Sequence, residues 1–128
     1  MKIIYTDGGS RGNPGKAACS FVFVENSKII MEKSKFLGKK TNNEAEYNAI
    51  IFALEELKEK NIEIISDSEL VIKQITGKYK INSPHLQLLN QIVSGLISKR
   101  KVKFSNLKRE NQFIKRADYL VNKELDKH

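Results

Sequence analysis

The apolar pattern of the sequence changes near residue 41, and this change limits the fold more than any other feature. Before it, three β-rich runs at residues 2–6, 17–25 and 28–37 are separated only by turn-forming segments. After it, apolar residues recur at helical spacing, with short strands expected at 62–66 and 101–104. Strands joined by turns pair antiparallel, whereas parallel strands need a crossover. The pattern therefore predicts an α/β fold whose antiparallel sheet is extended by parallel strands.

Capping residues mark the expected helices. Thr41 precedes Glu44 by three residues, which is the spacing of a capping box, and this helix is expected to run to about residue 60. Further helices are expected from 68 to about 77, from Pro84 to 97, and from 115 to 126. The strand at 2–6 is expected to end at Asp7, before the Gly/Pro-rich segment 8–15.

Length and composition exclude several classes of protein. The 128 residues, 40% hydrophobic and 30% charged, suffice for one domain with a core, residues 1–128. No apolar run approaches the ~20 residues of a membrane span, and the first residues do not resemble a signal peptide. We therefore expect a cytoplasmic protein without a membrane segment. The lone Cys19 excludes an intramolecular disulfide, and with only two histidines the chain lacks a Cys/His zinc cluster.

The net charge of +8 is unevenly distributed. Residues 99–116 contain eight cations and one acid, whereas residues 44–69 contain eight acids and two lysines. A basic balance suggests an anionic partner, although solubility alone also explains it. The acidic central third has no obvious use in a purely electrostatic binder.

Four acids occupy positions where a carboxylate is costly. Asp7 and Asp67 each directly follow an apolar run, at the carboxyl ends of expected central strands, where ligands bind in open α/β sheets. Glu46 and Asp118 fall on the apolar stripes of their helices. Taken singly, Asp7 and Asp67 could each be a cap or turn residue, and Asp118 could be an acid favoured near a helix N-terminus, whereas Glu46 must be paired or hold a metal. Together they predict one crevice lined by carboxylates.

Clustered carboxylates repel one another, and hard divalent cations relieve that repulsion. Oxygen-only ligation favours Mg²⁺ or Mn²⁺ over Zn²⁺. Two such ions, ~3.5–4 Å apart, stabilise the attacking and leaving oxygens of an in-line displacement at phosphorus. The basic segment would then hold a polyanion beside the metal site.

Four motifs, in this order, resemble type 1 ribonuclease H in its compact bacterial and archaeal form without a separate hybrid-binding domain. They are YTDGGSRGNPG at 5–15, TNNEAEY at 41–47, SDSELV at 66–71 and ADYL at 117–120. The resemblance implies a five-stranded mixed sheet, three antiparallel strands then two parallel, flanked by helices. It also implies hydrolysis of the RNA strand of RNA–DNA hybrids, with 5′-phosphate and 3′-hydroxyl products.

The resemblance also implies roles for individual residues. Asp7, Glu46, Asp67 and Asp118 would hold two Mg²⁺ ions, with Mn²⁺ as a substitute and Asp7 bridging both ions. The residues expected to contact the nucleic acid are Gly8, Gly9, Ser10, Asn13, Lys39, Thr41, Asn42, Asn43, Lys101, Lys103 and Arg109. Lys39 and Thr41 would belong to a pocket for a DNA-strand phosphate, although Thr41 is equally explained as a plain helix cap.

The chain departs from the family pattern in the loop before Asp118. Many members have a histidine there, and residues 107–113 read LKRENQF, so Arg109 and Glu110 are the candidates to replace it. Glu69 stands where a glutamine is common, and the basic helical insertion of some bacterial members is missing. Cleavage of double-stranded RNA and a monomeric state are further expectations. Two alternatives remain: an inactive hybrid- or duplex-binding module, and a relative acting on DNA, such as a transposase or integrase core.

Overall fold

The computed structural model describes residues 1–128 and contains one five-stranded sheet in the order β3-β2-β1-β4-β5. The strands are β1 (Lys2–Gly12), β2 (Gly15–Glu25), β3 (Lys28–Lys40), β4 (Asn61–Ser66) and β5 (Lys101–Asn106). β1 to β3 form an antiparallel meander, and β4 and β5 extend it in parallel. The mixed sheet predicted from the sequence is confirmed.

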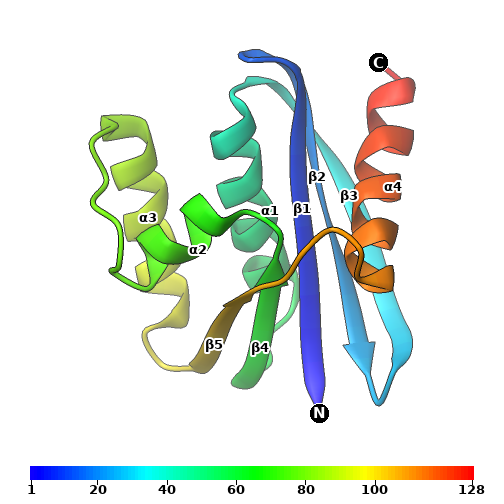
Figure 1. Ribbon diagram of the computed structural model, residues 1–128. Coiled ribbons are helices and arrows are strands. Elements are labelled where there is room, and N and C mark those ends of the chain that lie inside the picture. The colour runs from blue at the N-terminus through cyan, green and yellow to red at the C-terminus, as the bar shows by residue number, and fades with distance from the viewer.

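Helices cover both faces of the sheet (Figure 1). They are α1 (Asn42–Glu56), α2 (Glu69–Ile75), α3 (Pro84–Ile97) and α4 (Gln112–Asp126). Alternate residues of β1 separate the two faces, because successive strand side chains point to opposite sides. Ile4 belongs to the larger core under α1, α2 and α3, whereas Tyr5 packs in a smaller core with Ile114 and Ala117 of α4. No helix is long and apolar enough to cross a membrane.

Strand β1 is longer than the sequence pattern predicts. It was expected to end at Asp7, but it runs to Gly12 because β2 continues to pair with it as far as Gly15. Its pairing with β4 does end at Thr6, opposite Ser66. Asp7 is therefore the first residue of β1 beyond the parallel pairing, and Asp67 directly follows β4, so both acids occupy the same edge of the sheet.

Helix α1 begins as predicted and ends earlier. Thr41 Oγ1 accepts a hydrogen bond from Glu44 N–H at 3.1 Å, and Glu44 Oε1 accepts one from Thr41 N–H at 2.8 Å, which confirms the capping box. The helix stops at Glu56 rather than at 60, because Leu57 takes an extended backbone conformation. The Arg100 guanidinium donates to the carbonyls of Leu54 and Leu57, so one cation of the basic segment caps this helix end.

The remaining boundaries differ from the predictions by only a few residues. β5 continues to Asn106, where the predicted strand ended at 104. α4 begins at Gln112 rather than at 115, because the Asn111 side chain caps the amides of Phe113 and Ile114. The loop between β5 and α4 is therefore short, and it lies beside the edge that carries Asp67.

Candidate active site

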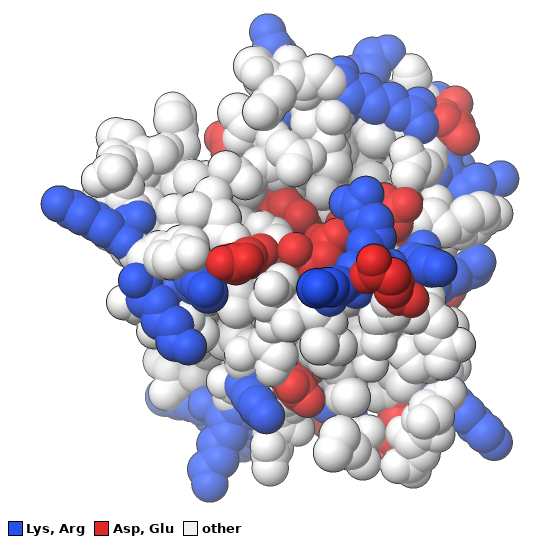
Figure 2. Space-filling view, in the orientation of Figure 1, with Lys and Arg blue, Asp and Glu red and all other residues white.

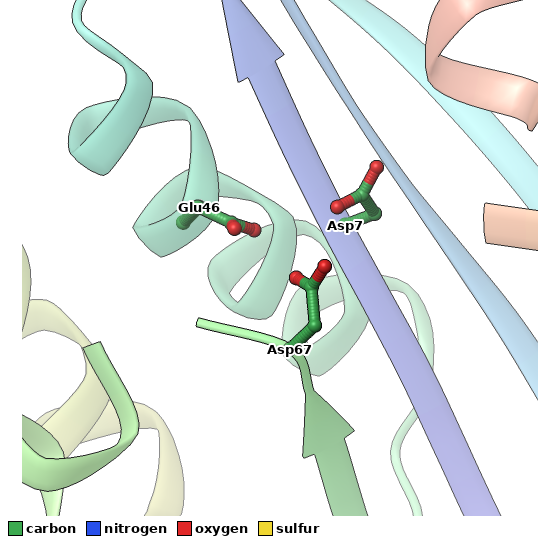
Figure 3. A group of neighbouring side chains, drawn as sticks. All are labelled: Asp7, Glu46 and Asp67. Atoms are coloured by element: carbon green, nitrogen blue, oxygen red, sulfur yellow. The ribbon is translucent and has the colours of Figure 1, made fainter. Parts of the chain in front are cut away.

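Three carboxylates from three separate elements meet at one edge of the sheet (Figure 3). Asp7 comes from β1, Glu46 from α1, and Asp67 from the residue after β4; one oxygen from each lies within 4.8 Å of the others. Three oxygen donors at this spacing match the ligands that Mg²⁺ and Mn²⁺ prefer. The donor set therefore fits a hard divalent cation.

Glu46 is held by the backbone of β1. Gly8 N–H donates a 2.8 Å hydrogen bond to Glu46 Oε1. A Cβ atom at Gly8 would lie 2.2 Å from the carbonyl oxygen of Ala45, so only glycine permits α1 to approach the strand this closely. The glycine after Asp7 thus explains how a helix acid reaches a strand acid.

Burial makes this cluster electrostatically unfavourable without a cation. Asp7 is 3% exposed and Glu46 is 6% exposed. Burial, together with the nearby Asp67 and Asp118 carboxylates, raises the pKa of Asp7 to about 8. Burial and the charge of Asp7 likewise raise the pKa of Glu46. Such perturbed, mutually repelling acids in a cleft are typical of a functional site.

Asp118 lines the same cleft from the opposite side of the sheet. It lies on α4, is half-buried, and shares the cleft with Asp7, Gly8 and Glu46. It is outside the group of three carboxylates that approach within 4.8 Å. The structure therefore brings the four predicted acids to one cleft. Three of them lie within 4.8 Å of one another, and Asp118 lies close enough to Asp7 for its charge and a side-chain hydrogen bond to raise the Asp7 pKa.

Arg109 is the predicted cation that contacts the cluster. Its Nε donates to Asp67 Oδ2 at 3.1 Å from the loop between β5 and α4. The Arg109 side chain is 67% exposed, whereas that of Asp67 is 10% exposed. Glu110 is also exposed in this loop. Figure 2 shows the acids gathered in the middle of this face with cations beside them.

The predicted nucleic-acid contacts divide between two depressions. Those in the cleft with the acids are Gly8, Gly9, Ser10 and Asn42. A second depression at the start of α1 is lined by Asn13, Thr41 and Asn43, together with Ser83 and His85. Asn13 Oδ1 accepts from Asn42 N–H at 2.9 Å, which connects the two sites. Lys39 is exposed and lines neither depression.

Lys101 and Lys103 lie away from the acids. Lys103 of β5 pairs with Glu63 of β4, and Glu63 pairs with Ile3 of β1. Ile3 lies four residues before Asp7. At ~3.3 Å per residue, that places Lys103 about 13 Å along the strands from the acidic edge. Lys101 is two residues further from that edge. The structure does not bring these two lysines to the cleft.

The sequence pattern did not predict two polar residues of the cleft. Arg11 and Asn122 line it beside the acids, and Arg11 Nη2 contacts Asp126 at 2.7 Å. Asn122 lies four residues after Asp118, on the same face of α4, so helical spacing could have indicated it. Arg11 carries no comparable signal, because its position depends on β1 extending past Asp7.

Comparison with known proteins assigns a family. A family model described as RNase H matches residues 1–125. The curated ribonuclease HI of Halobacterium salinarum is 46% identical over 87 residues, which cover 65% of this chain and 44% of that protein. The chain spans less than half the length of the first curated relatives that it matches.

Two solved structures match nearly the whole chain. The crystal structure of RNase H1 from Halobacterium salinarum has a TM-score of 0.90 and 37% identity, covering 99% of this chain and 98% of that one. LC11-RNase H1, isolated from compost and solved in complex with an RNA/DNA hybrid, has a TM-score of 0.90, 38% identity and the same coverage. With its matching fold and its cleft of acids, the chain belongs to the RNase H family.

Proposed function

We propose that the protein is an endoribonuclease that hydrolyses the RNA strand of RNA–DNA hybrids. The observation that carries the proposal is the close triad of Asp7, Glu46 and Asp67 in a chain of the RNase H family. A relative that shares its fold at a TM-score of 0.90 was solved with an RNA/DNA hybrid. The products would be 5′-phosphate and 3′-hydroxyl ends.

The residues that would hold metal are the triad together with Asp118. Two Mg²⁺ ions, or Mn²⁺ in their place, would supply an activated water and stabilise the leaving oxygen. Both Asp67 and Asp118 raise the pKa of Asp7, and this closeness to two other acids supports Asp7 as the ligand that would be shared by both ions. In the loop before α4, Arg109 and Glu110 are the residues proposed to take the place of the histidine of many relatives.

The cleft also supports recognition of the RNA strand. Gly8, Gly9, Ser10 and Asn42 line it beside the acids. Gly8 N–H donates to Glu46 and Ser10 N–H donates to Asn42 Oδ1, so the Asn42 side-chain NH₂ is the donor best placed to hydrogen-bond base edges and 2′-hydroxyls in the wide minor groove of a hybrid. Because the 2′-hydroxyl is both donor and acceptor, this side chain offers a way to distinguish RNA from DNA.

The second depression suits a phosphate of the DNA strand. Thr41 Oγ1 accepts from Glu44 N–H, and its hydroxyl proton can still be donated to a phosphate oxygen. Capping and phosphate binding by Thr41 are therefore compatible. Asn13 and Asn43 line the same depression, and Lys39 supplies a positive charge on neighbouring β3.

Cations would contribute the non-specific part of the affinity. Arg109 stands at the cleft, whereas Lys101 and Lys103 would contact only a hybrid that extends well beyond it. Binding that neutralises phosphates releases counterions, so hybrid affinity should fall steeply with salt. A hybrid affinity that does not change with salt concentration would argue against phosphate binding by these cations.

The test compares two glutamates of one helix. Glu46→Gln alters the triad, and Glu55→Gln removes an exposed acid of α1 as the matched control. With a labelled RNA–DNA hybrid and Mg²⁺, the control should cleave like wild type, whereas Glu46→Gln and Asp7→Asn should cleave about 10³-fold more slowly while remaining folded. Wild-type cleavage that persists in excess EDTA would contradict a metal mechanism.

The same assay distinguishes the substrates. Hybrid, double-stranded RNA and duplex DNA are each incubated with Mg²⁺ and with Mn²⁺. We expect cleavage of the hybrid, extend the proposal to double-stranded RNA, and expect duplex DNA to remain intact. Hybrid binding without turnover in either ion would indicate an inactive binding module. We also propose that residues 1–128 act as one monomeric domain, which sedimentation analysis can test.

A further inference from the structure

Arg109 is placed where it can respond to the charge of the metal site. Its loop is fixed at both ends: Leu107 N–H donates to the Ser66 carbonyl at 3.1 Å, and Asn111 caps α4. Between these points residues 107–110 are exposed. The Arg109 side chain extends from this loop back to Asp67.

The contact that holds this side chain in the cleft is an ion pair with a candidate metal ligand. Arg109 Nε donates to Asp67 Oδ2, and the rest of the guanidinium is largely in water. The charges of Asp118 and Asp7 also raise the pKa of Arg109, after that of Asp67. The guanidinium therefore partly neutralises a buried group of acids that would otherwise repel one another.

A divalent ion and this guanidinium compete for the same carboxylate. A divalent ion held by Asp67 would carry its +2 charge next to the +1 charge of the Arg109 guanidinium. Like charges at this range repel. Because the side chain is 67% exposed, it can turn into solvent without disturbing the core. The loop itself need not move, since its ends are fixed by backbone contacts and a helix cap.

We propose that Arg109 is an internal counter-ion of the metal-free active site, which holds Asp67 in place until a divalent cation displaces it. This inference rests on the proposed function, because it assumes that the triad binds metal. It assigns to Arg109 a role in setting the metal affinity. The protein would thereby exchange a weakly held internal cation for a metal ion, rather than bind the metal to an uncompensated cluster.

The test measures metal affinity without catalysis. Mn²⁺ is titrated calorimetrically into wild type, Arg109→Ala, Arg109→Lys and Arg116→Ala. Arg116 pairs with Glu32 at 2.6 Å outside the cleft, so its variant removes the same charge from another ion pair. Arg109→Ala should bind Mn²⁺ about tenfold more tightly, because a neighbouring charge shifts a carboxylate equilibrium by that order. Arg109→Lys and Arg116→Ala should stay close to wild type.

Thermal melting provides the second readout. In EDTA, Arg109→Ala should melt below wild type, and the rise in Tm on adding Mn²⁺ should be larger for it than for wild type or Arg116→Ala. A merely structural role would lower Tm equally with and without Mn²⁺. If wild type binds Mn²⁺ and Arg109→Ala binds no more tightly, the counter-ion role is wrong and the proposed function stands. If wild type binds no Mn²⁺ or Mg²⁺, the proposed metal site itself is wrong.

Discussion

Helices α1 and α4 each have 15 residues and lie on opposite faces of the sheet, yet they hold their acids in different ways. α1 buries eight residues, among them Glu46, because it is enclosed between the sheet and α3. α4 buries only four, spaced along a single stripe, and Asp118 is half-buried beside that stripe. The same chemical group is thus buried on one side of the cleft and partly hydrated on the other.

Two adjacent glycines of β1 show the cause of the difference. A Cβ atom at Gly8 would meet the Ala45 carbonyl of α1 at 2.2 Å, whereas one at Gly9 would meet the Val121 Cγ1 of α4 at 3.4 Å. α1 therefore contacts β1 through its backbone, and α4 contacts it through side chains. Backbone contact leaves little freedom, whereas side-chain packing can adjust. The cleft has one rigid wall and one adaptable wall.

The largest expected contrast is catalytic. Glu46→Gln should lower hybrid cleavage about 10³-fold, as removal of a preorganised charged group does. Asp118→Asn should lower it less, by about 10- to 100-fold, because Asp118 is half-buried, so that water can partly replace the lost carboxylate oxygen. Single-turnover kinetics with Mg²⁺ measure both losses. Equal losses would show that the fourth acid belongs fully to the inner set.

The two glycines give the next contrast, in stability. Gly8→Ala should cost about 3 kcal/mol, because neither backbone can yield without moving α1. Gly9→Ala should cost under about 1 kcal/mol, since 3.4 Å is an ordinary contact with a side chain. Urea unfolding in EDTA measures the free energy of unfolding of each. A costly Gly9→Ala would mean that α4 is as rigidly placed as α1.

The buried acid Asp7 should also make the stability of the protein depend on pH. With its pKa raised from 3.8 to about 8, Asp7 binds its proton more tightly in the folded protein than in the unfolded chain. The free energy of unfolding in EDTA should therefore fall as the pH rises between these values, by up to about 1.4 kcal/mol per pH unit. Below this range the contribution of Asp7 is fully present.

Two variants isolate that pH effect. Asp7→Asn removes one ionising group and one cause of the raised Glu46 pKa, so its stability should vary less with pH than that of wild type. Asp126→Asn removes an exposed acid at the end of α4 and should retain the wild-type slope. Urea titrations at pH 5, 6, 7 and 8 measure all three slopes. A wild-type slope that persists in Asp7→Asn would assign the effect to another group.

The smallest contrast concerns the polar contacts of each helix. Tyr47 Oη donates to Gln74 Oε1 at 2.8 Å between α1 and α2, and Ser20 Oγ donates to the Ala117 carbonyl at 2.6 Å between β2 and α4. Tyr47→Phe and Ser20→Ala should each cost about 1 kcal/mol, since each leaves a buried acceptor without its donor. Only Tyr47→Phe should also slow hybrid cleavage, because the rigid wall transmits the change to Glu46. Thermal melts and cleavage rates measured side by side decide this.

Much of the fold could be predicted because it depends on local rules. Turns between the first three strands and helices between the later ones specify an antiparallel meander extended in parallel. The capping box at Thr41 and Glu44 and the buried position of Glu46 also follow from spacing along one helix. The convergence of the acids on one cleft followed from their places at strand and helix ends.

Other features could not be predicted because they depend on distant partners. β1 continues past Asp7 only because β2 pairs with it as far as Gly12, and α1 ends at Glu56 where Arg100 caps its carbonyls. A count of cations also could not separate Arg109, which reaches Asp67, from Lys103, which lies far along the sheet.

The sequence by itself determined the order of strands and helices and the four acids that they carry, because hydrophobic periodicity and capping act within a few residues of the chain. Only the tertiary structure decided that Glu46 joins Asp7 and Asp67 in a close triad, buried, while Asp118 reaches Asp7 from the other face of the sheet and stays half-buried. The reason is the distance of approach between each helix and β1. The backbone of α1 contacts Gly8 directly, and the side chains of α4 keep it further from Gly9.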